Sequence, residues 1–403
     1  MSFENFNLDT KLLNSINSLG FHEPTPVQHQ AIPPALLGND IRVCSQTGSG
    51  KTISFVIPIV NSLLSDDFFG QRALILVPTR ELGIQVESVF EEVLKPLKMK
   101  SIALLGGMGY DKQLHALKTG AKIVVGTPGR LLDHLEQRSL KLDHIKFLVL
   151  DESDRMLDMG FMPDIRRIIS RCPEKRQTML YSATYPPEIQ RLVAQIQKDP
   201  VLIDLSSSTT APNITQIAYP ISKSQKEIFL LKLLEVHHID SVLIFSKTKQ
   251  GADYLVSILK KNGKSVSVIH SDRTQTERNE AIKRFKEKKD QILVATDIAS
   301  RGIDIKDISH VINYDVPEHS EDYVHRIGRT GRASASGDAF TLICPEEEPY
   351  FKRIEKFINA KITRGMIEGF PYLVKPNLNP KEKSLASSFG SIRRRIPMGK
   401  KRF

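Results

Sequence analysis

Residues 45–52 of this sequence combine residue types suited to binding phosphates. They read SQTGSGKT and follow a short apolar run at residues 41–44. In a glycine-rich loop of this type, backbone N–H groups surround the phosphates, Lys51 reaches the terminal ones and the Thr52 hydroxyl holds Mg²⁺. Ser45 stands where the strict pattern has its first glycine. The segment predicts a nucleotide site, with a glycine turn without function as the alternative.

A pair of acids, Asp151 and Glu152, directly follows the apolar run FLVL. The first acid suits Mg²⁺, held directly or through water, and the second suits orienting and deprotonating an attacking water. An isolated pair of this kind also occurs as two solvated acids at a strand end. The preceding phosphate loop favours nucleotide hydrolysis, with Lys51, Asp151 and Glu152 as catalytic residues and Thr52 and Asp151 around the metal.

Three arginines recur at a spacing of three in the segment YVHRIGRTGR, residues 323–332. Arg326, Arg329 and Arg332 share one face if the segment is helical, and fan out from a loop if the helix ends early. A solvated basic helix is the alternative. With a nucleotide site in the same chain, Arg329 and Arg332 are candidate arginine fingers for the terminal phosphate. Since they lie in the other half of the chain, catalysis requires closure of two domains.

Short apolar, β-branched runs must position these residues. The runs lie at residues 72–77, 122–125, 146–150 and 178–181, and again at residues 241–245, 265–269, 291–294, 310–314 and 338–343. Near-continuous apolar strands that alternate with helices indicate parallel sheets covered on both faces. The two series predict the α/β class, with two doubly wound parallel-sheet domains in tandem.

The boundaries follow from composition. Residues 205–212 read LSSSTTAP, a polar stretch without periodicity that is typical of a flexible linker. We therefore place the two domains at residues 1–205 and 215–368, the linker at 206–214, and a basic, flexible tail at 369–403. Polar residues come directly after the strands, as in PTRE after ALILV and DESD after FLVL. These residues lie at the carboxyl ends of the strands, which is where parallel sheets bind their ligands.

Charge is concentrated in the tail. The net charge is +11, and residues 371–403 hold nine Lys or Arg and one acid, so the tail carries +8 and the remainder +3. A basic arm usually contacts an anionic polymer. The apolar runs are too short to cross a membrane, and MSFENFNLDT lacks the features of a secretion signal. Cys44, Cys172 and Cys344 form no metal-spaced pair. We expect a cytoplasmic protein that does not associate with a membrane.

These motifs, in this order, resemble the DEAD-box family of superfamily 2 RNA helicases, over about residues 3–360. The resemblance implies two RecA-like domains, with ATP and Mg²⁺ as ligands. Phe3 and GFHEPTPVQ (residues 20–28) are similar to the adenine-recognition motif, in which Phe21 packs on the adenine and Gln28 reads its edge. The other ATP-binding residues that it implies are Gly48, Ser49, Gly50, Lys51, Thr52, Gly302 and Asp304, of which Asp304 meets the ribose hydroxyls.

The same resemblance implies an RNA path and a coupling set. The RNA-binding residues are Pro78, Thr79, Arg80, Gly107, Thr127, Pro128, Gly129 and Arg130 in the first half, and Thr248, Gln275, Arg278 and Thr296 in the second. The residues that couple ATP hydrolysis to RNA are Asp154, Ser182, Thr184, His325 and Arg326. RNA contact is expected mainly through the backbone, with low sequence specificity.

The sequence departs from the family pattern at two positions. Ser153 replaces the alanine of the acidic motif, which here reads DESD, and Ser271 replaces a glycine in His270–Asp272. The Ser153 hydroxyl adds one donor and little volume, so we expect activity to survive, with altered coupling as an open question. Within the family, the compact core and short basic tail most resemble the bacterial RhlE type.

The resemblance implies an ATP-dependent RNA helicase that hydrolyses ATP on RNA-induced domain closure and locally unwinds short duplexes, in ribosome assembly or RNA turnover. We expect a monomer, with the tail as a candidate contact for ribosomal or RNA-degradation proteins. Three alternatives stay open: a DNA helicase or translocase, an RNA clamp that does not unwind, and an ATPase that acts on proteins or small molecules. The basic tail disfavours the last of these.

Overall fold

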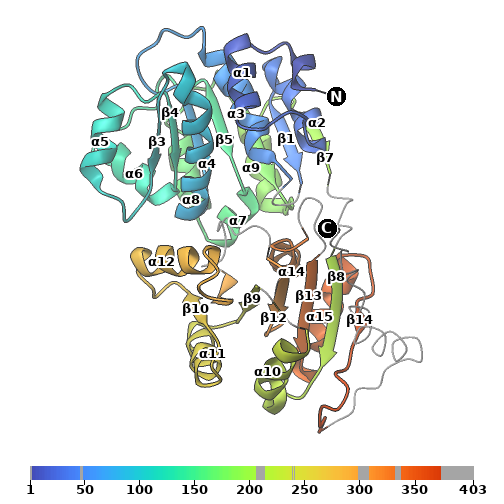
Figure 1. Cartoon of the computed structure of the whole chain (residues 1–403). Helices are drawn as coiled ribbons and strands as arrows, with labels where there is room; N and C mark the ends of the chain where they lie inside the picture. The colour runs from blue at the N-terminus through green and yellow to red at the C-terminus, as the bar shows by residue number, and fades with distance from the viewer. Residues whose placement is uncertain are drawn as a thin grey trace, which may run out of the picture. The chain divides into compact units, whose positions relative to one another are not determined.

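The chain forms two compact units (Figure 1). The structure, a computed structural model, describes residues 2–45, 49–205, 214–237, 239, 241–297, 308–331 and 337–373. Among these residues, the first unit runs up to residue 205 and the second begins at residue 214.

The first unit is built from seven strands and the helices that connect them. Its strands are β1 (Ile41–Cys44), β2 (Ala73–Leu76), β3 (Ser101–Leu104), β4 (Ile123–Gly126), β5 (Phe147–Leu150), β6 (Gln177–Ser182) and β7 (Val201–Asp204). Its helices are η1 (Phe3–Phe6), α1 (Thr10–Ser18), α2 (Pro26–Leu36), α3 (Lys51–Leu63), α4 (Arg80–Leu94), η2 (Lys95–Leu97), α5 (Tyr110–Lys118), α6 (Pro128–Glu136), α7 (Ser153–Asp158), α8 (Met162–Ile169) and α9 (Pro187–Ile196).

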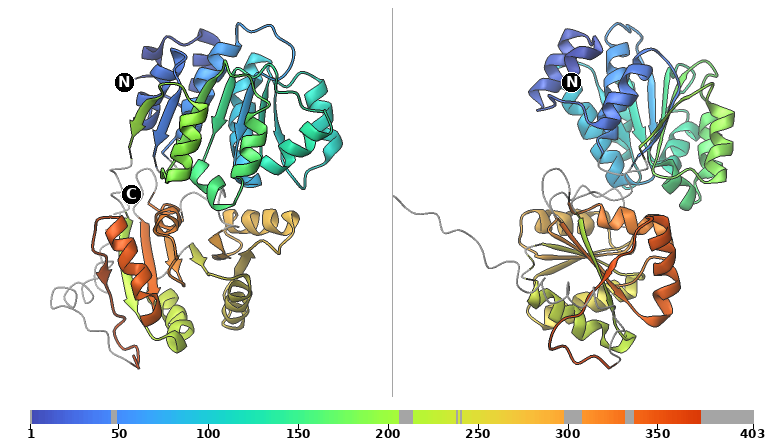
Figure 2. Two further views of the ribbon diagram at one scale, coloured as in Figure 1. Left: turned by 180° about the vertical axis from the view of Figure 1, so that it is seen from behind. Right: turned by 90° about the vertical axis from the view of Figure 1, so that its right-hand side faces the viewer.

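This sheet is parallel, in the order β3-β4-β2-β5-β6-β1-β7. Alternate residues of a strand point to opposite faces, so both faces are apolar. In β2, Ala73 and Ile75 enter one core with helices α1–α4, whereas Leu74 and Leu76 enter the other with α6, α8 and α9. Helices therefore cover both faces of the sheet (Figure 2).

The second unit repeats this architecture. Its strands are β8 (Ile214–Pro220), β9 (Val242–Phe245), β10 (Val266–Ile269), β11 (Ile292–Ala295), β12 (His310–Asn313), β13 (Gly337–Ile343) and β14 (Thr363–Arg364), in the parallel order β10-β11-β9-β12-β13-β8-β14. Its helices are η3 (Lys223–Gln225), α10 (Lys226–Val236), α11 (Lys249–Lys261), α12 (Gln275–Lys286), α14 (Ser320–Ile327), η4 (Pro345–Glu347) and α15 (Glu348–Phe357). Helices α10 and α11 pack in one core, and α14 and α15 in the other.

The predicted fold class is confirmed, and the predicted strands lie within a residue or so of the observed ones. Four strands were missed: β3, β7, β8 and β14. Strands β3 and β7 each contain a short apolar run, at residues 102–104 and 201–203, that was overlooked. Most of the predicted linker lies outside the described residues, but Ile214, its last residue, already belongs to β8.

The tail boundary was also misplaced. It was predicted at residue 369, but residues 370–373 pack on the second unit. The Phe370 and Tyr372 rings lie 5.0 and 6.0 Å from the Phe229 ring, and the Leu373 N–H donates to Gln225 Oε1 at 3.0 Å. Two aromatic side chains gain more from burial here than the short segment loses in conformational freedom. Residues 374–403 lie outside the described part of the chain.

In the part of the chain that the structure describes, no helix has the length and apolar character needed to span a membrane.

Candidate active site

The chemistry-bearing residues of the first unit lie at the carboxyl ends of its strands. Strand β6 lies between β1 and β5. The Ser45 N–H, after β1, donates to the Ser182 carbonyl at 3.0 Å, and the Asp151 N–H, after β5, donates to the Leu76 carbonyl at 3.0 Å. The phosphate loop and the acidic motif therefore meet at one edge of the sheet, where ligands of parallel sheets bind.

The described part of the phosphate loop is held in place by hydrogen bonds within the first unit. Lys51 is the first residue of α3, and its Nζ donates to the Ser45 carbonyl at 2.8 Å from a buried position. Gly50 has a φ of 92°, which favours glycine, and a Cβ there would lie 2.6 Å from Gln28 Nε2. Thr52 follows in the first turn of the helix, whose free N–H groups suit an anion. Gly48 lies outside the described residues.

The adenine-recognition candidates lie against this loop. Gln28 Nε2 donates to the Gly50 carbonyl at 3.0 Å, and its Oε1 accepts the Thr25 N–H at 2.9 Å. The Thr25 hydroxyl donates to the Ser49 carbonyl at 2.9 Å. Phe21 is half-buried and packs on the edge of the first core. The segment around Gln28 thus fixes the loop as well as lying beside it.

The acidic motif is buried as a block. Asp151, Glu152, Ser153 and Asp154 are each less than 10% exposed, and Asp151 Oδ1 accepts the Glu152 N–H at 3.0 Å. Burial raises the pKa of Asp151 to about 7, against the opposing charge of Lys51, while the charge of Glu152 adds to the rise. A cation beside this buried carboxyl would stabilise its ionised form.

Sequence reasoning missed Arg155. Its Nη1 donates to Glu152 Oε2 at 2.6 Å, and both side chains are buried. Glu152 has a left-handed backbone (φ 51°, ψ 51°) just before α7, which turns its side chain back over the helix start. The spacing of three residues between Glu152 and Arg155, at a helix start, is the signal that was available.

The coupling candidates of the first unit are joined directly. Asp154 Oδ2 accepts the Ala183 N–H at 3.1 Å and the Thr184 N–H at 2.9 Å, and the Asp154 N–H donates to Ser182 Oγ at 3.2 Å. Ser182 Oγ in turn donates to the Thr184 carbonyl at 2.7 Å. A movement of the acidic motif therefore displaces the segment after β6.

Ser153 is accommodated without a lost hydrogen bond. Its buried hydroxyl donates to the Tyr181 carbonyl at 3.3 Å. A buried hydroxyl without a partner costs free energy, so this contact explains how serine fits where the family has alanine.

The RNA candidates of the first unit fall into two groups. The buried Pro78 precedes Thr79, which caps α4 with its hydroxyl accepting the Leu82 N–H at 3.3 Å. Arg80 is the first residue of that helix. A Cβ on Gly107, whose φ is 76°, would lie 2.5 Å from Arg80 Nη1, so this glycine lets the guanidinium approach the backbone.

The second group lies at the start of α6. Thr127 is its N-cap, Pro128 its first residue, and Gly129 is exposed. The Arg130 guanidinium lies 5.6 Å from the centre of the Tyr110 ring, and its Nη1 makes no hydrogen bond to any described residue. A helix start with a donor left over suits a phosphate.

The RNA-binding candidates of the second unit lie on three elements: the start of α11, the start of α12 and the segment after β11. Thr248 caps α11, with its hydroxyl accepting the Gly251 N–H at 3.0 Å, and Gln275 and Arg278 lie in the first turns of α12. Thr296 follows β11 and is buried.

Arg326 is engaged within the second unit. Its guanidinium pairs with Asp297 at 2.6 and 2.7 Å, donates to the Asp315 carbonyl at 2.8 Å, and lies 4.9 Å from the Phe245 ring centre. Helix α14 ends at Ile327, so the buried Arg329 lies past the helix, while the half-buried His325 lies within it. Gly302, Asp304 and Arg332 lie outside the described residues.

Family models match both units. The DEAD/DEAH box helicase family matches residues 25–192, and the helicase conserved C-terminal domain matches residues 225–334. The DEAD-box ATP-dependent RNA helicase CshA of Bacillus subtilis is 40% identical over 365 residues, which are 90% of this chain and 74% of that protein. ATP-dependent RNA helicase CshA of Listeria monocytogenes is 42% identical, over 88% of this chain and 68% of the relative.

Solved structures agree with these relatives. Saccharomyces cerevisiae Dbp5 bound to RNA and ADP BeF3 is 31% identical, with a TM-score of 0.82 over 90% of this chain and 95% of that one. The helicase Mss116 bound to ssRNA and UDP-BeF is 28% identical, with a TM-score of 0.82 over 96% of this chain and 81% of that one. The RhlE type stays a prediction, because both bacterial relatives named above are CshA proteins. The chain belongs to the DEAD-box family of ATP-dependent RNA helicases.

Proposed function

We propose that this DEAD-box helicase uses ATP to clamp single-stranded RNA and so opens a few base pairs locally. The observation that carries the proposal is the buried chain of contacts at one sheet edge. Lys51 reaches the loop, Glu152 is held by Arg155, and Asp154 holds the segment from Ser182 to Thr184. In this proposal, nucleotide chemistry at Glu152 is transmitted through Asp154 to the coupling residues Ser182 and Thr184.

A Mg²⁺ ion accompanies the ATP in this proposal. The buried Asp151 carboxyl, with its raised pKa, and the Thr52 hydroxyl at the start of α3 suit a cation held partly by water and phosphate. When bound, the ion would neutralise charge on the phosphates. Lys51 would bind the terminal phosphates, and Glu152 would accept a proton from the attacking water.

RNA would bind through phosphates and 2′-hydroxyls, with little dependence on sequence. As a scale, a duplex DNA step stacks with about 1.4 kcal/mol, so opening three to five steps costs several kcal/mol, within reach of joint ATP and RNA binding. We further propose a cytoplasmic, monomeric protein that serves ribosome assembly or RNA turnover, with the basic tail contacting ribosomal or RNA-degradation proteins.

The first test is steady-state ATP hydrolysis without nucleic acid, with single-stranded RNA, and with DNA of the same sequence, at one salt concentration. Strong stimulation by RNA alone is expected. Equal stimulation by DNA would favour the DNA-translocase alternative. Glu152→Gln is expected to keep ATP and RNA binding but to slow hydrolysis by about 10²-fold or more, and near-normal turnover would remove Glu152 as the base.

The arginine finger is tested separately. Arg329→Ala is expected to leave ATP affinity unchanged while RNA-stimulated hydrolysis falls by about 10³-fold or more. Full stimulation in this variant would refute the role of Arg329.

A further inference from the structure

Strand β10 is the outermost strand at one end of the sheet in the second unit. It pairs with β11 through Val266–Ile292 to Ile269–Ala295. The Ser265 and Ile269 carbonyls accept the N–H groups of Ile292 and Thr296, so the odd-numbered residues face β11. In a parallel strand, the residues between them direct their N–H and C=O groups the other way. Val266 and Val268 therefore present donors and acceptors at the free edge of β10.

Helices α11 and α12 flank this edge and form a groove with it, which we call the β10 groove. Its cavity measures about 740 Å³ and is lined by Val256, Lys260, Lys264, Val266, Val268, Arg273, Glu277, Glu280, Ala281, Arg284, Lys289 and Asp290, with smaller polar residues among them. The valine and alanine side chains line its apolar part. An extended peptide that adds to a sheet edge uses such a groove, with backbone hydrogen bonds for affinity and side-chain pockets for specificity.

The charge of the groove favours an acidic occupant. Five of the lining residues named above are cationic and three are acidic. Asp290 is paired with Arg284 at 2.8 Å, and Glu277 accepts the Thr274 N–H and hydroxyl at 2.7 Å. The cations Arg284, Arg273 and Lys289 are paired as well, with Asp290, Asp253 and Glu287. Lys260 and Lys264 therefore supply most of the positive charge that the groove offers to an occupant.

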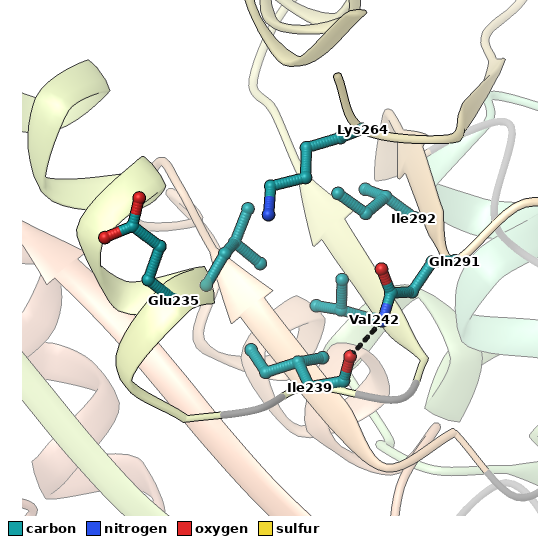
Figure 3. A pocket seen from close by; sticks show the side chains of 7 residues that line it. Glu235, Ile239, Val242, Lys264, Gln291 and Ile292 are labelled. Carbon is teal, nitrogen blue, oxygen red and sulfur yellow. Dashed lines mark hydrogen bonds between the residues drawn. The ribbon is translucent and has the colours of Figure 1, made fainter. Parts of the chain in front are cut away.

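A second cavity of about 360 Å³ adjoins the first, and Lys264 lines both. Leu234, Ile239, Val242 and Ile292 line it together with Gln291. Lys264 reaches into it from the side opposite Glu235 (Figure 3). Because polar groups dominate its accessible surface, this cavity suits a hydrogen-bonding side chain at the end of an extended peptide.

We propose that the β10 groove docks an extended, acidic peptide segment of a partner protein as an additional strand on β10. The occupant is a strand because the free groups of Val266 and Val268 repeat every second residue, as the groups of a paired strand do. A peptide is favoured over RNA because an RNA backbone has no N–H and C=O groups that repeat in this way and could pair with Val266 and Val268. This site is separate from the ATP-binding residues, so it goes beyond the proposed helicase activity.

The probe is a fluorescein-labelled octapeptide of alternating valine and glutamate residues, titrated with the full-length protein and followed by anisotropy. We expect saturable binding that weakens with salt, and no comparable binding of the counterpart with lysine in place of glutamate. Lys260→Glu combined with Lys264→Glu should weaken binding about tenfold or more. Absence of saturable binding up to about 1 mM peptide would overturn the proposal.

A proline substitution at the free edge of β10 tests strand addition itself. Val268→Pro removes a donor that faces away from β11, and proline is tolerated at such an edge position. We expect this variant to keep RNA-stimulated ATP hydrolysis and to lose peptide binding by at least about tenfold, whereas Val268→Thr, which keeps the N–H, should bind normally. Equal binding by the proline variant would overturn the strand geometry.

The matching groove of the first unit supplies the control. Strand β3 is also outermost, but the cavity beside it is smaller, about 330 Å³, and is lined by Glu87 and Glu91 together with Lys95 and Lys100. Lys95→Glu with Lys100→Glu should leave peptide binding unchanged. If the double variant at Lys260 and Lys264 instead weakens RNA binding and lowers its salt dependence, the groove is part of the RNA path and the peptide proposal fails.

Discussion

The buried pair of Glu152 and Arg155 places a strained backbone and an ion pair where hydrolysis is proposed to occur. Glu152 is a non-glycine residue with a left-handed backbone, and its carboxylate lies 2.6 Å from Arg155 Nη1. A residue in that conformation costs of order 1–3 kcal/mol and persists only when its surroundings hold it. The arginine therefore helps to fix the orientation of the proposed base.

Replacing Arg155 tests this role. Arg155→Met removes this ion-pair partner of the buried Glu152 carboxylate, so we expect kcat for RNA-stimulated ATP hydrolysis to fall about tenfold or more. The KM for ATP should change much less, because Lys51 and the loop are untouched. Arg155→Lys should restore part of the rate. Removing one partner of a buried pair costs about 3–5 kcal/mol, so a parallel measurement of unfolding must show that the variant is folded. An unchanged kcat in the methionine variant would contradict the assignment.

Ser153→Ala should change stability and RNA-stimulated ATP hydrolysis very little. The hydroxyl makes one neutral hydrogen bond, to the Tyr181 carbonyl, and such a bond contributes about 0.5–1.5 kcal/mol to stability. We expect the free energy of unfolding to change by about 1 kcal/mol or less and RNA-stimulated hydrolysis to stay within about twofold. A large rise in hydrolysis without RNA would instead show that Ser153 alters the coupling between the two ligands.

At the scale of elements, most of the strands predicted from the sequence are buried on both faces. All four residues of β2, β5, β9 and β11 are buried, and each reads as a short apolar run. Strand β7 was missed because its apolar run, residues 201–203, is only three residues long, although it does form the edge strand, where Val201 and Leu202 are exposed. The motifs that follow the strands could be assigned because parallel strands end at one edge. The pairing of Glu152 with Arg155 could not, since it depends on a backbone conformation that no pattern specifies.

Asp66 anchors the loops at the opposite end of the first sheet. Its carboxylate accepts hydrogen bonds from Arg72 at 2.9 Å and Lys146 at 2.7 Å, the residues that precede β2 and β5, and from the Phe68 N–H at 3.0 Å. Burial alone would raise the pKa of Asp66, but the hydrogen bonds from Lys146, Phe68 and Arg72 outweigh it and hold this pKa well below its usual range. The ionised carboxylate therefore stabilises the folded state.

The lowered pKa predicts a pH-dependent stability. A carboxyl with a lowered pKa contributes its full stability above its ordinary pKa of about 3.9 and loses it as the pH falls towards the folded value. Asp66→Asn should therefore destabilise the first unit by about 1–3 kcal/mol at pH 7 and by progressively less below about pH 4. Hydrogen exchange of the β2 and β5 amides reports on this unit alone. A difference that stays constant from pH 7 to pH 3 would contradict the role of the charge.

At the scale of the whole molecule, the boundary between the packed second unit and the basic tail lies after Leu373, not at residue 369 as composition suggested. Residues 374–403 hold all nine cations and the single acid counted from residue 371 onwards. The aromatic residues Phe370 and Tyr372, by contrast, pack on Phe229 in the core of the second unit. Composition marked residues 369–403 as one basic segment because aromatic residues are few, and their burial depends on a ring far away in the sequence.

Two truncations separate these contributions. A chain ending at Leu373 loses a net charge of +8 but keeps both rings, so RNA affinity should fall and its dependence on salt should flatten, while the KM for ATP and the thermal stability stay unchanged. A chain ending at Gly369 loses the same charge together with Phe370 and Tyr372, and loss of a buried aromatic ring costs about 3–5 kcal/mol. The second truncation should therefore match the first in its salt dependence but melt at a lower temperature. If the first truncation leaves the salt dependence of RNA binding unchanged, the tail does not contact RNA phosphates. If both melt alike, residues 370–373 add nothing to the second unit.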